Sequence, residues 1–116
     1  MSKPKINYLE FPASNLNQIK AFYSSVFAFE FQDFGPEYTA FMNAGIDGGF
    51  YLSDKSSRVE NGAGLVVFYS ENLNQTQQAI LQAGGSVVVD IFEFPGGKRF
   101  HFLDVCGNEF AVWSDK

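Results

Sequence analysis

Hydrophobic and polar residues alternate with strand-like and helix-like spacings that come in the same order in the two halves of the chain. In the first half, alternation over 6–11 predicts a strand, which Pro12 ends because proline donates no ladder hydrogen bond. An apolar stripe with helical spacing follows, made of Leu16, Ile19, Tyr23 and Val26 and widened by Phe22 and Phe27. Three more strands are predicted at 29–34, 38–43 and 48–53. This half is therefore expected to form strand, helix and three strands.

The second half repeats this order. A strand is predicted at 64–70 and a weaker helix at 72–83, which Gly84-Gly85 stops because glycine adopts the left-handed conformation that ends helices. Further strands are predicted at 86–92, 98–104 and 108–114. Both halves are thus expected to have the same element order.

A repeat at an offset of 57 residues supports a duplication. It aligns residues 15–18 with 72–75, both Asn-Leu-Asn-Gln, and Phe11 with Phe68. We expect one domain over 1–116, with a first module at about 5–54 and a second at about 63–115. Each module covers one sheet face with its single helix, so we expect the uncovered faces to meet around a groove. Such a groove is where a small ligand would bind.

Composition narrows the chemistry. The 116 residues include 14 Phe, 5 Tyr and 1 Trp but only one Cys and one His, which excludes a disulfide framework and a zinc finger. The net charge of −5 disfavours binding to nucleic acid or to anionic membranes. Without a secretory signal or a transmembrane stretch, and with a single cysteine, we expect a cytoplasmic protein.

Several motifs resemble one known family. They are the Phe-Pro-Ala-Ser-Asn-Leu run at 11–16, Ala21-Phe22-Tyr23 before 26–29, Ala83-Gly84-Gly85, and 104–110 near the end. Together they resemble the glyoxalase/bleomycin-resistance/dioxygenase superfamily, or vicinal oxygen chelate fold, and its short branch related to lactoylglutathione lyase. The resemblance implies an α+β fold in which two tandem βαβββ modules form a curved mixed sheet around a groove, with the helices outside. It also implies a homodimer.

The resemblance implies four metal ligands, which the chain does not supply. Enzymes of the family bind a divalent metal through one residue on the first strand and one on the last strand of each module. These positions fall at Tyr8, at Leu65, at about Phe50 and at Ala111. Leu, Phe and Ala have no donor atom, and protonated tyrosine binds metals poorly. We therefore expect no metal and no cofactor.

Alternation along the strands predicts which side chains share the groove with the former ligand positions. The expected lining is Tyr8, Glu10, Phe50, Leu52, Leu65, Val67, Tyr69, Glu109, Ala111 and Trp113. This lining suits a planar, apolar or partly cationic organic molecule through stacking, cation–π contacts and carboxylate pairing. The alternative is that the aromatic residues only fill a core.

Three residues are candidates for catalysis in a metal-independent lyase or isomerase. Tyr8 and Glu10 share the first strand, and His101 is the only imidazole. Together with Arg99, His101 could also bind an anion. The alternative is that His101 is a structural histidine that only makes an ordinary hydrogen bond. Glu10 and Glu109 form a paired-carboxylate candidate or are simply solvated. A third hypothesis is a dimerisation module. The expected partners are a small molecule and a second copy, with neither nucleic acid nor membrane.

Overall fold

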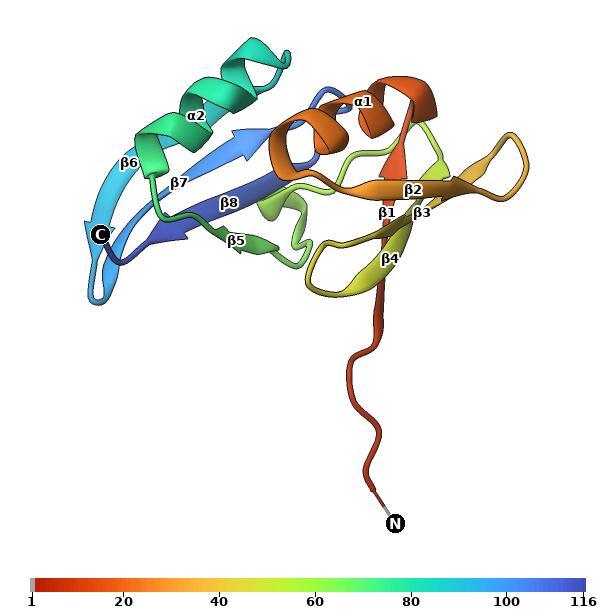
Figure 1. The fold of residues 1–116 in the computed structure, drawn as a ribbon, viewed down its shortest axis with the longest axis horizontal. Helices are drawn as coiled ribbons and strands as arrows, with labels where there is room; N and C mark the ends of the chain where they lie inside the picture. Colours follow the sequence, from red (N-terminus) through yellow and green to blue (C-terminus); the bar gives the residue numbers. More distant parts are fainter. Residues whose placement is uncertain (1) are drawn as a thin grey trace.

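Two βαβββ modules make up the chain, and each forms one four-stranded sheet with one helix (Figure 1). The computed structural model describes residues 2–116, so Met1, part of the expected domain, lies outside them. The first module contains β1 (Tyr8–Ala13), α1 (Leu16–Phe27), β2 (Glu30–Asp33), β3 (Tyr38–Met42) and β4 (Asp47–Leu52). A connection with the short 3-10 helix η1 (Val59–Asn61) leads to the second module. That module contains β5 (Val67–Tyr69), α2 (Leu73–Gln82), β6 (Ser86–Phe94), β7 (Gly97–Leu103) and β8 (Glu109–Ser114).

The two sheets have equivalent topologies. Sheet one has the order β1-β4-β3-β2, and sheet two has the order β5-β8-β7-β6. In each sheet the first and last strands of the module pair in parallel, and the other pairs are antiparallel. The predicted α+β fold with two βαβββ modules is therefore confirmed.

The repeated Asn-Leu-Asn-Gln motif forms the same helix start in both modules. The Asn15 side chain accepts a hydrogen bond from the Gln18 amide at 2.9 Å, and Asn72 accepts one from the Gln75 amide at 3.0 Å. Both are N-caps, which satisfy an amide that has no partner within the helix. The motif therefore repeats because each helix needs this cap after a strand.

Strand bounds differ from the prediction at Pro12. β1 continues through Pro12 to Ala13 instead of ending there. β1 lies at the edge of sheet one, so the missing N–H of Pro12 leaves no neighbouring strand without a donor.

One aromatic core joins the two modules. Tyr23 of α1 is fully buried and stacks on Phe50 of sheet one, with ring centroids 5.3 Å apart. Phe27 of α1 stacks on Phe68 of sheet two at 4.0 Å. The Tyr23 hydroxyl donates to the Asp104 carboxylate at 2.8 Å, and burial, together with that carboxylate, raises the pKa of Tyr23. Helix α1 thus packs on both sheets.

Each sheet therefore has a core face and an open face, the open face being the one turned away from the shared core. On the open faces Tyr8, Val67 and Tyr69 are between 42% and 47% exposed. Residues 2–7 form an exposed arm that extends away from the body of the molecule before β1 (Figure 1). None of the helices within residues 2–116 has the length and apolarity needed to cross a membrane.

Candidate functional site

The strand register decides which predicted residues share the open face of sheet one. Glu10 pairs with Gly49, and Phe11 pairs with Phe50. Paired residues on neighbouring strands point to the same face, so Phe50 lies on the core face with Phe11. Phe50 is only 1% exposed. The expectation that Phe50 lines a groove with Tyr8 is therefore wrong.

Leu52 lies two residues after Phe50 on β4, so its side chain points to the same face of the sheet as that of Phe50. It sits at the exposed end of β4 and pairs with Ala13. Its expected position beside Tyr8 and Glu10 is also wrong. The prediction failed because Gly48-Gly49 has no side chains from which the register of this strand can be deduced.

A hydrogen-bonded cluster occupies the open face of sheet one. The Tyr8 and Tyr38 hydroxyls lie 2.6 Å apart, and the Tyr38 hydroxyl donates to Glu10 Oε2 at 2.9 Å. Partial desolvation and these two neighbours raise the pKa of Tyr38, which stays protonated as a donor. Gly49 makes room for this ring, because a Cβ there would lie 2.2 Å from the Tyr38 hydroxyl. Tyr38 was not predicted as a site residue from the sequence, because its hydrogen bond to Glu10 depends on the pairing of β3 with β4.

The residues at the family's ligand positions do not fit a metal. Ala111 pairs with Val67 in sheet two as Gly49 pairs with Glu10 in sheet one, so Gly49 is the structural counterpart of Ala111. Neither Gly49 nor Ala111 has a donor atom, and the Tyr8 hydroxyl is bonded to Tyr38. Across residues 2–116 no group of three or more His, Cys, Asp or Glu side chains is arranged to hold a metal ion.

A row of four side chains crosses the open face of sheet two, one from each strand. Phe92 pairs with Arg99, Arg99 pairs with Trp113, and Trp113 pairs with Tyr69. The guanidinium carbon of Arg99 lies 5.3 Å from the Phe92 ring centroid, and the Trp113 and Tyr69 rings meet edge to face at 5.1 Å. We call these four residues the aromatic row.

A hollow of about 230 Å³ lies beside the aromatic row. Its walls are Val67, Phe94, Arg99 and Trp113. Val67 and Trp113 were among the predicted lining residues, and the structure brings them together here. Phe94 was missed because β6 extends two residues beyond the predicted strand. Leu65, another predicted lining residue, precedes β5 and is half-buried.

His101 and Glu109 form a buried pair on the same face. His101 Nδ1 lies 3.0 Å from Glu109 Oε2, while Glu109 Oε1 accepts from the Val59 amide and from Arg58 Nε, each at 3.3 Å. Burial opposes ionisation of Glu109, but the bonds from His101, Val59 and Arg58 outweigh it and lower the pKa of Glu109. The alternative that Glu109 is simply solvated is therefore wrong, because this residue is only 6% exposed. Two of its partners, Arg58 and Val59, come from the connecting segment, which carries no periodic pattern.

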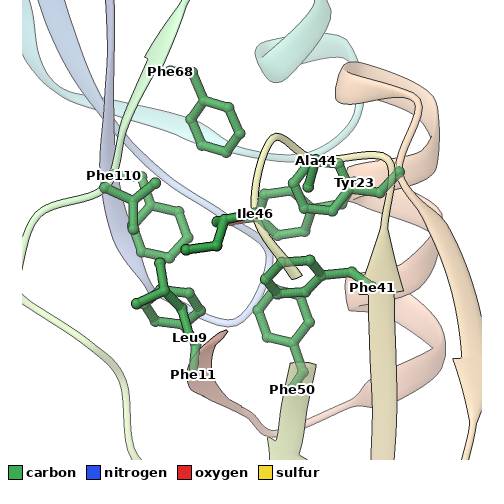
Figure 2. A pocket seen from close by; sticks show the side chains of 11 residues that line it. Leu9, Phe11, Tyr23, Phe41, Ala44, Ile46, Phe50, Phe68 and Phe110 are labelled. Carbon is green, nitrogen blue, oxygen red and sulfur yellow. The ribbon is translucent and has the colours of Figure 1, made fainter. Parts of the chain in front are cut away.

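The space between the two modules is packed with side chains. Figure 2 shows a cavity there, lined by Leu9, Phe11, Tyr23, Phe29, Phe41, Ala44, Ile46, Phe50, Val66, Phe68 and Phe110. Its volume of about 30 Å³ suits little more than one water molecule. Many of the aromatic residues therefore build a core, as the alternative interpretation held. The aromatic row, on the open face of sheet two, is a separate and only partly buried group.

Comparison with known proteins assigns the family. Residues 5–112 match the model of the Glyoxalase/Bleomycin resistance protein/Dioxygenase superfamily. The chain belongs to this superfamily. No curated protein sequence matches it significantly.

Solved structures share the fold at low sequence identity. A fosfomycin resistance protein from Listeria monocytogenes superposes with a TM-score of 0.80 at 15% identity, covering 99% of this chain and 96% of that one. A family enzyme from Burkholderia phytofirmans gives 0.76 at 15% identity, covering 95% and 98%. A lactoylglutathione lyase from Agrobacterium tumefaciens gives 0.70 at 19% identity, covering 98% and 96%.

Proposed function

We propose that this protein binds a small apolar or aromatic molecule, without a metal, on the open face of sheet two. The observation that carries the proposal is the hollow of about 230 Å³ between Val67, Phe94, Arg99 and Trp113. Rings that remain open to solvent beside such a hollow bind aromatic ligands by offset or edge-to-face stacking. Proteins with this fold include a lactoylglutathione lyase and a fosfomycin resistance protein, both named for small molecules.

The size of the hollow limits the ligand. Pockets for drug-sized molecules measure about 300–1,000 Å³. A hollow of about 230 Å³ therefore suits a ligand of one or two rings. The family's metal-ligand positions offer no donor set beside it, so we propose that stacking and polar side chains hold the ligand.

Trp113 allows a direct test, because it is the only tryptophan of the chain. In ¹H–¹⁵N NMR spectra its indole N–H gives a single, separate signal. On titration with a set of one- and two-ring aromatic compounds, we expect at least one compound to shift this signal and the Val67 and Tyr69 amide signals together. The Tyr51 amide, on sheet one, serves as the internal control. Shifts confined to the Tyr8–Tyr38–Glu10 cluster, or no shifts at all, would refute the proposed site.

We also propose that the protein is a homodimer. β1 and β5 are edge strands, and edges with unpaired backbone groups favour pairing with another chain. The arm before β1 carries Ile6, which is 81% exposed. An apolar side chain on an extended arm supports a contact with a second copy.

A second candidate function is a metal-independent lyase or isomerase. It is favoured by the buried His101–Glu109 pair, which orients an imidazole, and by the Tyr8–Tyr38–Glu10 hydrogen bonds. For this function, turnover of a candidate substrate would be abolished or strongly reduced in Tyr8→Phe, Glu10→Gln or His101→Ala. Turnover that survives all three changes would remove these residues from the mechanism.

A further inference from the structure

The guanidinium of Arg99 lies on the open face of sheet two without a charged partner. Its Nε atom is buried and makes no hydrogen bond within residues 2–116. The ion pairs of the described chain involve Lys20, Arg58 and His101 but not Arg99. Arg99 forms part of the wall of the hollow, and its guanidinium donors have no acceptor within the described chain, so its position points to an acceptor supplied by a ligand.

Aromatic rings hold the Arg99 guanidinium in place. Its carbon lies 5.3 Å from the Phe92 ring centroid and 5.7 Å from that of Phe94. Such cation–π contacts orient the planar group while leaving its edge free to donate. A guanidinium donates two parallel hydrogen bonds to a carboxylate, and the apolar rings around it reduce competition from water.

Two carboxylates on this side of the sheet, Glu109 and Asp115, already accept hydrogen bonds. Glu109 accepts hydrogen bonds from His101 and Arg58. The Tyr69 hydroxyl donates to Asp115, which raises the pKa of Tyr69 to about 12 and keeps it neutral. In a chain of net charge −5, the hollow therefore presents an unpaired positive group. This arrangement favours an anionic ligand over the partly cationic one that the sequence suggested.

We infer that Arg99 binds the carboxylate of an aromatic acid of one or two rings, while the ring of the acid stacks in the hollow beside Trp113. This inference rests on the proposed function and adds the charge of the ligand to it. Val67 and Phe94 supply the remaining apolar wall. The acid is bound without any covalent step.

Two probes of the same shape test the role of the charge. We would titrate the protein with 4-nitrobenzoate and with the neutral 4-nitrobenzamide, using calorimetry and the Trp113 indole signal. The wild type is expected to bind the carboxylate about tenfold more tightly, the factor that one charge-assisted hydrogen bond provides. Arg99→Gln is expected to abolish this preference while leaving the affinity for the amide within about twofold.

Two further variants keep the test interpretable. Arg99→Lys retains the charge but loses the planar fork, so it should keep part of the preference and serves if Arg99→Gln does not fold. Lys98→Gln removes the same charge from the neighbouring residue, whose side chain points to the other face of β7, and should leave both affinities unchanged.

The outcomes separate the two proposals. Equal binding of both probes to the wild type, or a preference that survives in Arg99→Gln, overturns the role of Arg99 and leaves aromatic binding intact. If neither probe binds and other uncharged aromatic compounds also fail to shift the Trp113 signal, both proposals are wrong. If Arg99→Gln instead dissociates an oligomer without changing the preference, a second copy pairs with Arg99 and the inference is overturned.

Discussion

Tyr23 connects the two modules through one buried hydrogen bond to Asp104. Burial raises the pKa of Asp104, although the bond from Tyr23 and those from the Cys106 and Asn108 amides oppose the shift. Tyr23→Phe leaves the ring packed but removes a donor from a buried carboxylate. We expect the free energy of unfolding to fall by about 1–3 kcal/mol in urea denaturation.

The matched control for this change is Tyr51→Phe. Tyr51 is 40% exposed, and its hydroxyl makes no hydrogen bond within residues 2–116. We expect the control to stay within about 0.5 kcal/mol of the wild type. Equal losses in both variants would contradict the role assigned to the Tyr23 hydroxyl.

Glu109 is expected to make the free energy of unfolding depend on pH, with its stabilising contribution lost at low pH. Its pKa is lower in the folded chain than in the unfolded chain, so its contribution is present above the unfolded value and is lost as pH falls through the folded value. The difference in unfolding free energy between the wild type and Glu109→Gln should shrink between about pH 5 and pH 3. Urea denaturation at several pH values measures it, and a constant difference would argue against the bonded carboxylate.

For individual residues, the sequence predicted the sheet face of some site residues but not of others. Strand alternation put Tyr8, Glu10, Val67 and Trp113 on open faces because their strands have clear patterns. It failed for Phe50, because two glycines precede it and hide the register. Partners from other strands or from the connection, such as Tyr38 and Arg58, had no local signal, since only tertiary pairing brings them close.

At the scale of elements, β4 fits against β3 only because Gly49 lacks a side chain. Gly49→Ala would place a Cβ 2.2 Å from the Tyr38 hydroxyl and 2.9 Å from the Thr39 carbonyl oxygen. We expect a loss of about 1–3 kcal/mol, as for other overpacked sites, together with a shift of the Tyr38 ring signals in NMR spectra.

Gly64→Ala is the control for this substitution. A Cβ at Gly64 would meet no atom within 4 Å. We expect the unfolding free energy of the control to stay near the wild-type value or to rise slightly, because alanine restricts the unfolded chain. A Gly49→Ala variant as stable as this control would contradict the β3–β4 packing described above.

The elements themselves followed closely from the sequence. Both helices were predicted from their apolar spacing, and in the structure each begins after an asparagine N-cap. Strand ends were less well predicted. β5 spans only Val67–Tyr69, and β1 runs through Pro12, because strand length depends on the neighbouring strand and on edge position.

For the whole molecule, the arm before β1 and the two edge strands lead to a prediction about assembly. Light scattering after size exclusion should give about twice the chain mass of 12.9 kDa. Ile6→Asp should lower this mass towards the monomer, because a charge replaces the exposed apolar side chain of the arm. Leu81→Asp, on the exposed side of α2, is the matched control and should leave the mass unchanged. A monomer at all concentrations would contradict the proposed homodimer.

The duplicated modules and the family were accessible from the sequence because repeats and ordered motifs survive as local patterns. The hollow on sheet two could not be predicted from the sequence. It depends on the register of all four strands of that sheet, including the bulged pairing of β6 with β7. The same applies to the shared core. Its cavity lies where the two modules meet, and no single segment predicts it.

Native mass spectrometry of protein purified without chelator tests whether the chain binds a small aromatic molecule without a metal. We expect that no divalent metal remains bound in stoichiometric amounts, and that adding 4-nitrobenzoate produces one adduct per chain. Either a stoichiometric divalent metal or the absence of any aromatic adduct would contradict this claim.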